Sequence, residues 1–332
     1  MSSEVWLVDS FGEPKTVLQR GRIDVREPGP GEIAVEVDAI GLNFLDVSVC
    51  RGGYVSQPEL PLVPGAELAG RVASVGDGVD TLRPGDRVAA MSPSALGAFA
   101  ASIVVPATAA HRVPDAMPDE QAAAILVTYQ TAYVALLRRA ALQEGEWLLV
   151  HAGAGGVGTA AIQLARAVGA RVIATAGTSE KRTVCEEQGA EVALDYRAGD
   201  FAGAVREATG GHGFDVLFDP VGGETWERSL DCAAFEARLI PIGWASGTPP
   251  ALAAPALLGR NLTVIGVSWG SAYPLVRPDV VANAHDHLVE LHAAGAVRPL
   301  VPRVWSYDEL PDAVQALGDG HVIGKAIVKG FE

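Results

Sequence analysis

The clearest chemical motif in the sequence is a glycine-rich turn that follows a short apolar run. Trp147 to Val150 is predicted as a buried strand, and a helix is predicted over residues 159–168. Between them, Gly153, Gly155 and Gly158 have the spacing Gly-x-Gly-x-x-Gly. In this context the glycines let the backbone approach a pyrophosphate, and the free amides of the helix N-terminus stabilise its charge. An ordinary glycine-rich turn is the weaker alternative, because a further strand is predicted over 171–176. The predicted dinucleotide contacts here are Gly153, Gly155, Gly156, Val157 and Gly158.

The residues after that further strand select the dinucleotide. NAD-binding sites usually end this strand with a carboxylate that accepts hydrogen bonds from the ribose, and residues 174–179 contain none. Thr178, Ser179, Lys181 and Arg182 lie instead at the start of a predicted helix, where a cation is unfavourable unless an anion is close. A 2'-phosphate would be that anion, so NADPH is the predicted cofactor. The alternative is that Lys181 and Arg182 are solvated charges, partly offset by Glu180.

Composition limits the class of protein and its partners. The chain has 332 residues, 49% of them apolar and 20% charged, which is enough for two domains with their own cores. A net charge of -15 argues against nucleic-acid binding, which needs a basic face. The longest apolar stretch, residues 122–137, is interrupted by polar residues and is short for a bilayer, so no membrane partner is expected. The first residues do not have the pattern of a signal peptide, which indicates the cytoplasm. Three cysteines without metal-type spacing are expected as reduced thiols.

Residues 1–120 carry short, valine-rich strands separated by turn signals, as in a small β-rich domain. An alanine-rich helix is predicted over 119–142, and strands and helices then alternate to about residue 265. This alternation predicts a doubly wound parallel sheet with helices on both faces. In addition to those above, strands are predicted over 32–39, 68–75, 87–90, 192–195, 215–219, 239–242 and 262–267, and helices over 179–188, 201–209 and 224–233.

Ligands of such sheets bind beyond the carboxyl ends of the strands. Candidates at those ends are His151, Ala176, Tyr196, residues 219–222 and residues 243–246. Towards the C-terminus, helices are predicted over 278–294 and 308–317, and strands over 301–305 and 325–328. We expect this tail to return and complete the first domain.

Several segments match one family in its own order along the chain. They are residues 41–46, 64–70, 85–88, 129–133, the glycine turn, 219–222 and 324–328. On these residues the chain resembles the zinc-free quinone oxidoreductase, or zeta-crystallin-like, branch of the medium-chain dehydrogenase/reductase superfamily. The resemblance implies an α/β protein with a GroES-like, β-rich catalytic domain over residues 1–121 and 268–332. It implies a Rossmann NADPH-binding domain over 122–267, an active site in the cleft between the domains, and a homodimer or tetramer.

The resemblance also bears on metals. Zinc-dependent relatives supply catalytic metal ligands from a Cys and a Gly-His-Glu segment, and these places are Asn43 and Gly65-Ala66-Glu67 here. The cysteines of a structural zinc lobe are missing too, so no zinc site is expected. His285 and His287 lie on different faces of a predicted helix, and a solvated face is expected for them rather than a metal.

By resemblance, Asn43 and Tyr54 face the nicotinamide and the acceptor, and Thr131 holds the carboxamide. The alternative for Tyr54 is a loop aromatic that packs on its own glycine turn. Some quinone reductases carry a second tyrosine shortly after the Asn, and this chain has Ser48 at that place. The difference affects the expected shape of the acceptor site.

Other residues have implied cofactor roles. Lys181 matches a 2'-phosphate contact, Tyr196 an adenosine contact and Lys325 a late cofactor contact of the family. Trp269 is predicted either as a wall of the substrate pocket or as core. The remaining predicted cofactor contacts are Val221, Gly243 and Val267.

The implied reaction is hydride transfer from NADPH to a small conjugated acceptor, with the cofactor carrying the chemistry. A quinone is the leading acceptor, and a 2-enoyl or other α,β-unsaturated carbonyl compound is the alternative. A non-catalytic NADPH-binding sensor or structural protein is the alternative from a different class.

Overall fold

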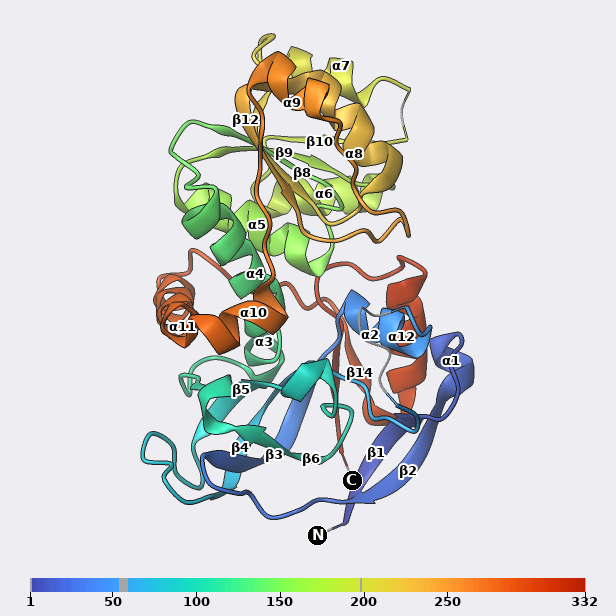
Figure 1. The fold of residues 1–332 in the computed structure, drawn as a ribbon, viewed down its shortest axis with the longest axis vertical. Coiled ribbons are helices and arrows are strands. Elements are labelled where there is room, and N and C mark those ends of the chain that lie inside the picture. The colour runs from blue at the N-terminus through green and yellow to red at the C-terminus, as the bar shows by residue number, and fades with distance from the viewer. Residues whose placement is uncertain (1, 54–58, 198, 332) are drawn as a thin grey trace. The chain divides into compact units, whose positions relative to one another are not determined.

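The computed structural model describes residues 2–53, 59–197 and 199–331, which form two compact units (Figure 1). One unit holds the chain up to Val127, then Gly270–Val289 and everything from Pro299 on. The other holds Thr128–Trp269 and Glu290–Arg298. Among the described residues, no helix combines the length and the apolar character needed to cross a membrane.

The second unit is built on a parallel sheet of six strands in the order β10, β9, β8, β11, β12, β13. The chain runs outward from β8 through β9 to β10 and then restarts beside β8 with β11, so the strand order reverses between β8 and β11. The strands are β8 Trp147–Val150, β9 Arg171–Thr175, β10 Val192–Leu194, β11 Phe214–Asp219, β12 Ala233–Pro241 and β13 Thr263–Val264. Helices α5 Gly156–Ala167, α6 Ser179–Gln188, α7 Phe201–Ala208, α8 Gly223–Ser229 and α9 Ala254–Arg260 accompany them.

This arrangement confirms the predicted doubly wound parallel sheet. Every residue of β8 is buried, as expected for a central strand that helices cover on both faces. Sheets of this kind bind ligands where the strand order reverses, beyond the carboxyl ends of the strands. The glycine turn directly follows β8, so it lies at that place.

Two predicted boundaries in this unit were wrong. The helix predicted through Ala233 ends at Ser229, and after a 3-10 turn over Leu230–Cys232 the residue Ala233 already begins β12. Arg260 donates to the carbonyls of Leu230 and Ala233, which stabilises the end of the helical segment there. Strand β13 covers only two of the six residues predicted, because Gly266 follows and the strand lies at the sheet edge.

The single helix predicted over 119–142 was also wrong. The structure breaks it into α3 Asp119–Ala122, a π-helical turn over Ile125–Tyr129, α4 Gln130–Tyr133 and a second π-helical stretch over Val134–Arg139. The N–H groups of Leu126 and Val127 donate to a carboxylate oxygen of Glu67, at 2.8 and 2.9 Å. The binding of these N–H groups by the Glu67 side chain accounts for the wide turn. π-Bulges form where the regular i to i−4 hydrogen bonds of a helix are interrupted.

The first unit is β-rich. Its main sheet has seven strands in the order β14, β15, β3, β4, β5, β7, with β6 paired to β3, and β1 and β2 form a separate antiparallel pair. The strands are β1 Ser2–Val8, β2 Leu18–Asp24, β3 Glu32–Gly41, β4 Glu67–Val75, β5 Arg87–Met91, β6 Ser102–Pro106, β7 Ala110–Arg112, β14 Val304–Ser306 and β15 Ile327–Lys329. The long helices are α2 Phe44–Cys50, α10 Trp269–Val276, α11 Pro278–Ala293 and α12 Leu310–Gly318, and α1 Pro14–Val17 is a single turn.

The C-terminal tail returns to this sheet. Strand β15 pairs antiparallel with β3, so that Ile327 lies opposite Gly41. The core beneath the sheet joins early and late parts of the chain, for example Val35, Leu68 and Leu310. This pairing also brings Lys325, just before β15, to the carboxyl end of β3.

Candidate functional site

The glycine turn has the steric properties of a phosphate-binding loop. A Cβ on Gly153 would lie 2.8 Å from Cβ of Ala174, and one on Gly158 would lie 2.4 Å from the carbonyl oxygen of Ala152. Both positions therefore need glycine for packing. A Cβ on Gly155 would meet nothing closer than 3.3 Å, so its lack of a side chain leaves open space beside the turn.

The N-terminus of α5 offers free donors at this turn. Gly155 is the N-cap and makes no side-chain cap, and no acidic residue lies in the first turn. The first amides of a helix have no partner within it, so those of Gly156, Val157 and Gly158 are available to an anion. Together with the helix dipole they fit a diphosphate.

The adenosine end of the predicted site lies at α6. The hydroxyl of Thr178 caps this helix by accepting from the backbone N–H of Lys181, and Ser179 is its first residue. Burial lowers the pKa of the Lys181 ammonium. Tyr196 is close by, because a Cβ on Gly177 would lie 3.2 Å from its ring. The structure thus brings Tyr196 to the turn that precedes α6.

Sequence reasoning missed two charged residues beside them. Arg197 lies near Gly177 as well, since the same Cβ would be 3.4 Å from its guanidinium carbon. Asp195, just after β10, binds Arg182 at 3.2 Å and Arg197 at 3.3 Å. Arg182 is therefore held in an ion pair. Arg197 directly follows the predicted contact Tyr196, and that adjacency was the only signal in the sequence.

Two turns meet at the carboxyl ends of β11 and β12. Asp219 accepts hydrogen bonds from the backbone N–H groups of Val221 and Gly222, at 2.7 and 3.1 Å. A Cβ on Gly243 would lie 3.5 Å from the carbonyl oxygen of Pro220, so the two turns are neighbours. Val267 follows β13 and is half-buried, and Trp269 is buried at 4% exposure.

His151, a candidate because it follows β8, has a different place. Its ring is fully buried, with Nδ1 2.9 Å from the hydroxyl of Thr175 and Nε2 2.7 Å from that of Ser229. Burial lowers its pKa to about 3, so the ring is neutral at physiological pH. The side chain thus links β8, β9 and α8 beneath the glycine turn.

The first unit contains a second group of predicted site residues. Lys325 is 4% exposed, and its ammonium donates to Oδ1 of Asn43 at 2.6 Å and to Oε2 of Glu67 at 2.7 Å. The amide nitrogen of Asn43 donates to the carbonyl of Gly41 at 3.0 Å and to Oε2 of Glu67 at 3.2 Å. Glu67 is fully buried, and its Oε1 accepts from the backbone as described above. We call Asn43, Glu67 and Lys325 the lysine cluster.

Asp46 lies next to the lysine cluster. It is fully buried on α2 and accepts a hydrogen bond from the backbone N–H of Asn43 at 2.7 Å. Burial raises the pKa of its carboxyl to about 7, with the Asn43 N–H and Lys325 acting in the opposite direction. Neither Glu67 nor Asp46 was among the predicted site residues, although Glu67 lies in the segment that the resemblance compares with metal ligands of zinc-dependent relatives.

Three more residues bear on the predicted site, namely Thr131, Ser48 and Tyr54. Thr131 lies in α4, in the second unit, and is half-buried. Ser48, at the place of the second tyrosine, donates to the carbonyl of Phe44 within α2. Tyr54 lies outside the described residues. The catalytic and cofactor roles of all these residues stay predictions.

Two family models match the chain. An alcohol dehydrogenase GroES-like domain matches residues 29–115, and a zinc-binding dehydrogenase domain matches residues 156–289. A quinone oxidoreductase-like protein 2 homolog from Nematostella vectensis is 34% identical over 97% of this chain and 87% of that protein. The chain belongs to the quinone oxidoreductase branch of the medium-chain dehydrogenase/reductase superfamily. The predicted family and fold class are confirmed, and the chain is an oxidoreductase.

Bacterial members of this branch are similar along their whole length. Quinone oxidoreductase 1 from Escherichia coli K12 is 37% identical over 90% of each chain. The crystal structure of Escherichia coli quinone oxidoreductase complexed with NADPH aligns with a TM-score of 0.91 at 33% identity, covering 98% of this chain and all of that one.

The name of one family model implies zinc, and the residues present here do not fit that ion. The places that the resemblance assigns to catalytic zinc ligands hold the Asn43 amide and residues 65–67, and the Lys325 ammonium already binds Glu67. Zinc sites are built from thiolate, imidazole and carboxylate ligands, and a cation would be repelled by the ammonium. His285 is buried, its Nε2–H donates to the carbonyl of Arg112 at 2.7 Å, and its ring stacks on His111. The solvated face predicted for it was therefore wrong. Across the part of the chain that the structure describes, no group of three or more potential ligands could hold a metal.

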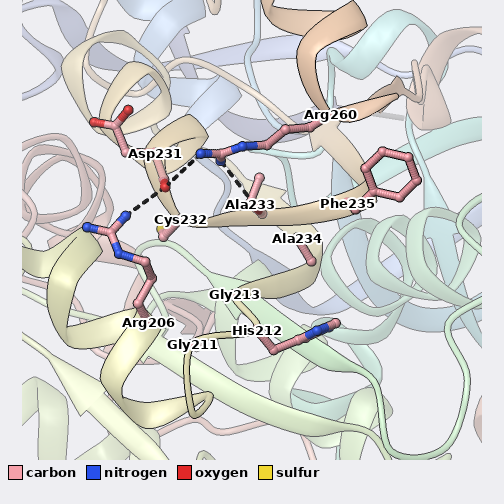
Figure 2. Close-up of a pocket in the computed structure, with 10 residues that line it drawn as sticks. All are labelled: Arg206, Gly211, His212, Gly213, Asp231, Cys232, Ala233, Ala234, Phe235 and Arg260. Carbon is pink, nitrogen blue, oxygen red and sulfur yellow. Dashed lines mark hydrogen bonds between the residues drawn. The ribbon is translucent and has the colours of Figure 1, made fainter.

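A pocket in the second unit lies away from the glycine turn (Figure 2). It is at the amino ends of β11 and β12, opposite to the carboxyl ends. Figure 2 shows the guanidinium groups of Arg206 and Arg260 converging on the carbonyl of Asp231, and Arg206 reaches it at 2.7 Å. These arginines bind carbonyls at the end of a helix, so the pocket is explained by helix capping rather than by a ligand.

The buried His151 gives a prediction for stability. In the folded protein it stays neutral down to about pH 3, whereas in the unfolded chain it takes up a proton below about pH 6.5. This contribution is therefore fully present above pH 6.5 and falls by about 1.4 kcal/mol per pH unit below it. In His151→Asn, the free energy of unfolding should decrease less on acidification than in the wild type. Urea unfolding at neutral pH and at about pH 5 measures this. The exposed His321→Asn is the control, and an identical pH dependence in His151→Asn would refute the role.

Proposed function

We propose that this oxidoreductase transfers a hydride from NADPH to a quinone. The proposal is carried by its similarity, over nearly the whole chain, to the Escherichia coli quinone oxidoreductase whose structure holds NADPH. When bound, NADPH supplies the hydride from C4 of its nicotinamide. The residues of this chain bind it, orient it and stabilise the charge that reduction creates.

The described residues fit this cofactor. The uncapped amides of Gly156, Val157 and Gly158 would hold the diphosphate. Lys181 in the first turn of α6 and Arg197 beside Tyr196 would supply cations for the 2'-phosphate and the adenosine. The strand before them ends without a carboxylate, which favours NADPH over NADH.

The nicotinamide half has its own proposed contacts. Val221 and Gly243 lie in neighbouring turns at the carboxyl ends of β11 and β12, with Val267 after β13. Thr131 is proposed to hold the carboxamide. On the first unit, Asn43 and Lys325 are proposed to face the reacting groups.

The proposed activity is tested by the loss of NADPH absorbance with a panel of acceptors. We expect 1,4-benzoquinone and 9,10-phenanthrenequinone to be reduced much faster than crotonyl-CoA or a 2-alkenal. Quinone reduction needs little acid catalysis, whereas enoyl reduction requires protonation at carbon. Preference for the enoyl compounds would assign the enzyme to α,β-unsaturated carbonyl reduction. Tight NADPH binding without turnover of any acceptor would favour a sensor or structural role.

The Lys181→Ala variant tests the choice of cofactor. A charge-assisted contact to phosphate is lost with this side chain, so the Kd for NADPH should rise about 10-fold or more while that for NADH changes little. Fluorescence titration with each nucleotide measures both constants. The exposed Lys15→Ala should leave both unchanged. Equal losses for NADPH and NADH would contradict a role in binding the 2'-phosphate.

We also propose a cytoplasmic homodimer. The three cysteines are buried and unpaired, as in a reducing compartment. Strand β13 is the edge of its sheet, where Val264 is 43% exposed, and Leu258 and Phe235 are more exposed still, at 78% and 66%. An open edge with apolar residues favours pairing with a second copy. Light scattering should give a dimer for the wild type and a smaller mass for Val264→Glu, and a monomeric wild type would contradict the proposal.

A further inference from the structure

The hydrogen-bonding capacity of the lysine cluster is almost fully used. The Asn43 amide has two N–H donors, and they bind the carbonyl of Gly41 and Oε2 of Glu67. Its oxygen accepts from Lys325. Asn43 therefore has no donor left for a substrate oxygen, although it is the residue predicted to face the acceptor.

Lys325 is different. An ammonium has three N–H donors, and two of them bind Asn43 and Glu67. Among the described residues, no group takes the third donor. A buried ammonium with an unused donor loses free energy, unless a ligand or water accepts from it.

The positive charge of Lys325 also balances the negative charge of Glu67, as a metal ion bound to Glu67 would. Glu67 is fully buried, and the Lys325 ammonium at 2.7 Å supplies the compensating charge. This ammonium bridges the side chains of Asn43 and Glu67, which the resemblance compares with the metal ligands of zinc-dependent relatives. A buried carboxylate without a partner would be strongly destabilising, and the ammonium offsets that cost.

We propose that Lys325 is the internal cation of the active site and stands in place of the catalytic metal of zinc-dependent relatives. Its third N–H donates to the acceptor oxygen that becomes negative. This inference rests on the proposed quinone reduction. In that reaction the C4–H bond of the cofactor breaks and the hydride adds to the quinone. One carbonyl oxygen becomes a phenolate and takes its proton from solvent, while Lys325 stays protonated throughout.

A donor aimed at developing negative charge is worth more in a buried place than in water, and Lys325 is 4% exposed. A double variant in which both residues are uncharged separates the contribution of Lys325 to the reaction from its structural role. Lys325→Met alone leaves Glu67 buried without a partner and is expected to impair folding. The double variant Lys325→Met/Glu67→Gln removes both charges and is expected to fold, which circular dichroism verifies. Lys329→Met, at the last residue of β15 and four residues after Lys325, is the matched control at a less buried lysine.

The first readout is independent of NADPH and of turnover. A nitrophenol absorbs at longer wavelength as the phenolate, so the spectrum of the bound molecule reports its ionisation. We expect the wild type and Lys329→Met to bind 4-nitrophenol as the phenolate. In the double variant the ratio of phenolate to phenol in the bound state should fall about 10-fold or more. An unchanged ratio, or a wild type that binds only the neutral phenol, would overturn the proposal.

The second readout is quinone reduction. Loss of one preorganised donor should lower kcat of the double variant about 100-fold, with a smaller change in KM. A folded double variant with the kcat of the wild type would overturn the proposal. If the wild type reduces no quinone but still binds the phenolate through Lys325, the proposed function fails and the assignment of Lys325 stands.

Discussion

The buried pair of Glu67 and Lys325 is the interaction on which the first unit depends. Two charges lose their hydration there, and the pair is favourable only if their remaining hydrogen-bonding groups are satisfied. Glu67 meets this condition with the backbone N–H groups of Leu126 and Val127 on one oxygen and with Asn43 and Lys325 on the other. The pair therefore holds the start of β4, the segment after α3 and the C-terminal tail at one point.

Close packing around this point leaves little freedom for other residues. A Cβ on Gly41 would lie within 2 Å of the carbonyl oxygen of Ala123, so only glycine allows β3 to end so close to the segment after α3. Asp46 is buried nearby, and burial raises the pKa of its carboxyl to about 7. Within this buried region the ammonium of Lys325 compensates the charge of Glu67.

The sequence was most informative where the signals are local. The bounds of β8 and α6 are those predicted, and β9 ends one residue before its predicted end, because an apolar run, a glycine turn and a helix cap are readable within a few residues. The two-stranded pair of β1 and β2 and the helix α2 were not predicted. The break in the helix predicted after Asp119 could not be read from the sequence, because Glu67 lies about 60 residues before the N–H groups that it binds.

The candidate site divides in the same way. The phosphate-binding turn could be predicted from the spacing of its glycines, whereas Arg197 required the fold to bring it to Gly177. The resemblance implied that Lys325 contacts the cofactor, and only the structure shows its hydrogen bonds to Asn43 and Glu67. Contacts between residues more than 250 positions apart leave no pattern in one sequence.

A double-mutant cycle between Glu67 and Lys325 tests the central claim most directly. The free energy of unfolding would be measured for the wild type, Glu67→Gln, Lys325→Met and the double variant. We predict that each single substitution costs about 3–5 kcal/mol and that the double variant loses much less than the sum of the two. Additive losses, equal to that sum within about 0.5 kcal/mol, would contradict the claim that this pair organises the site.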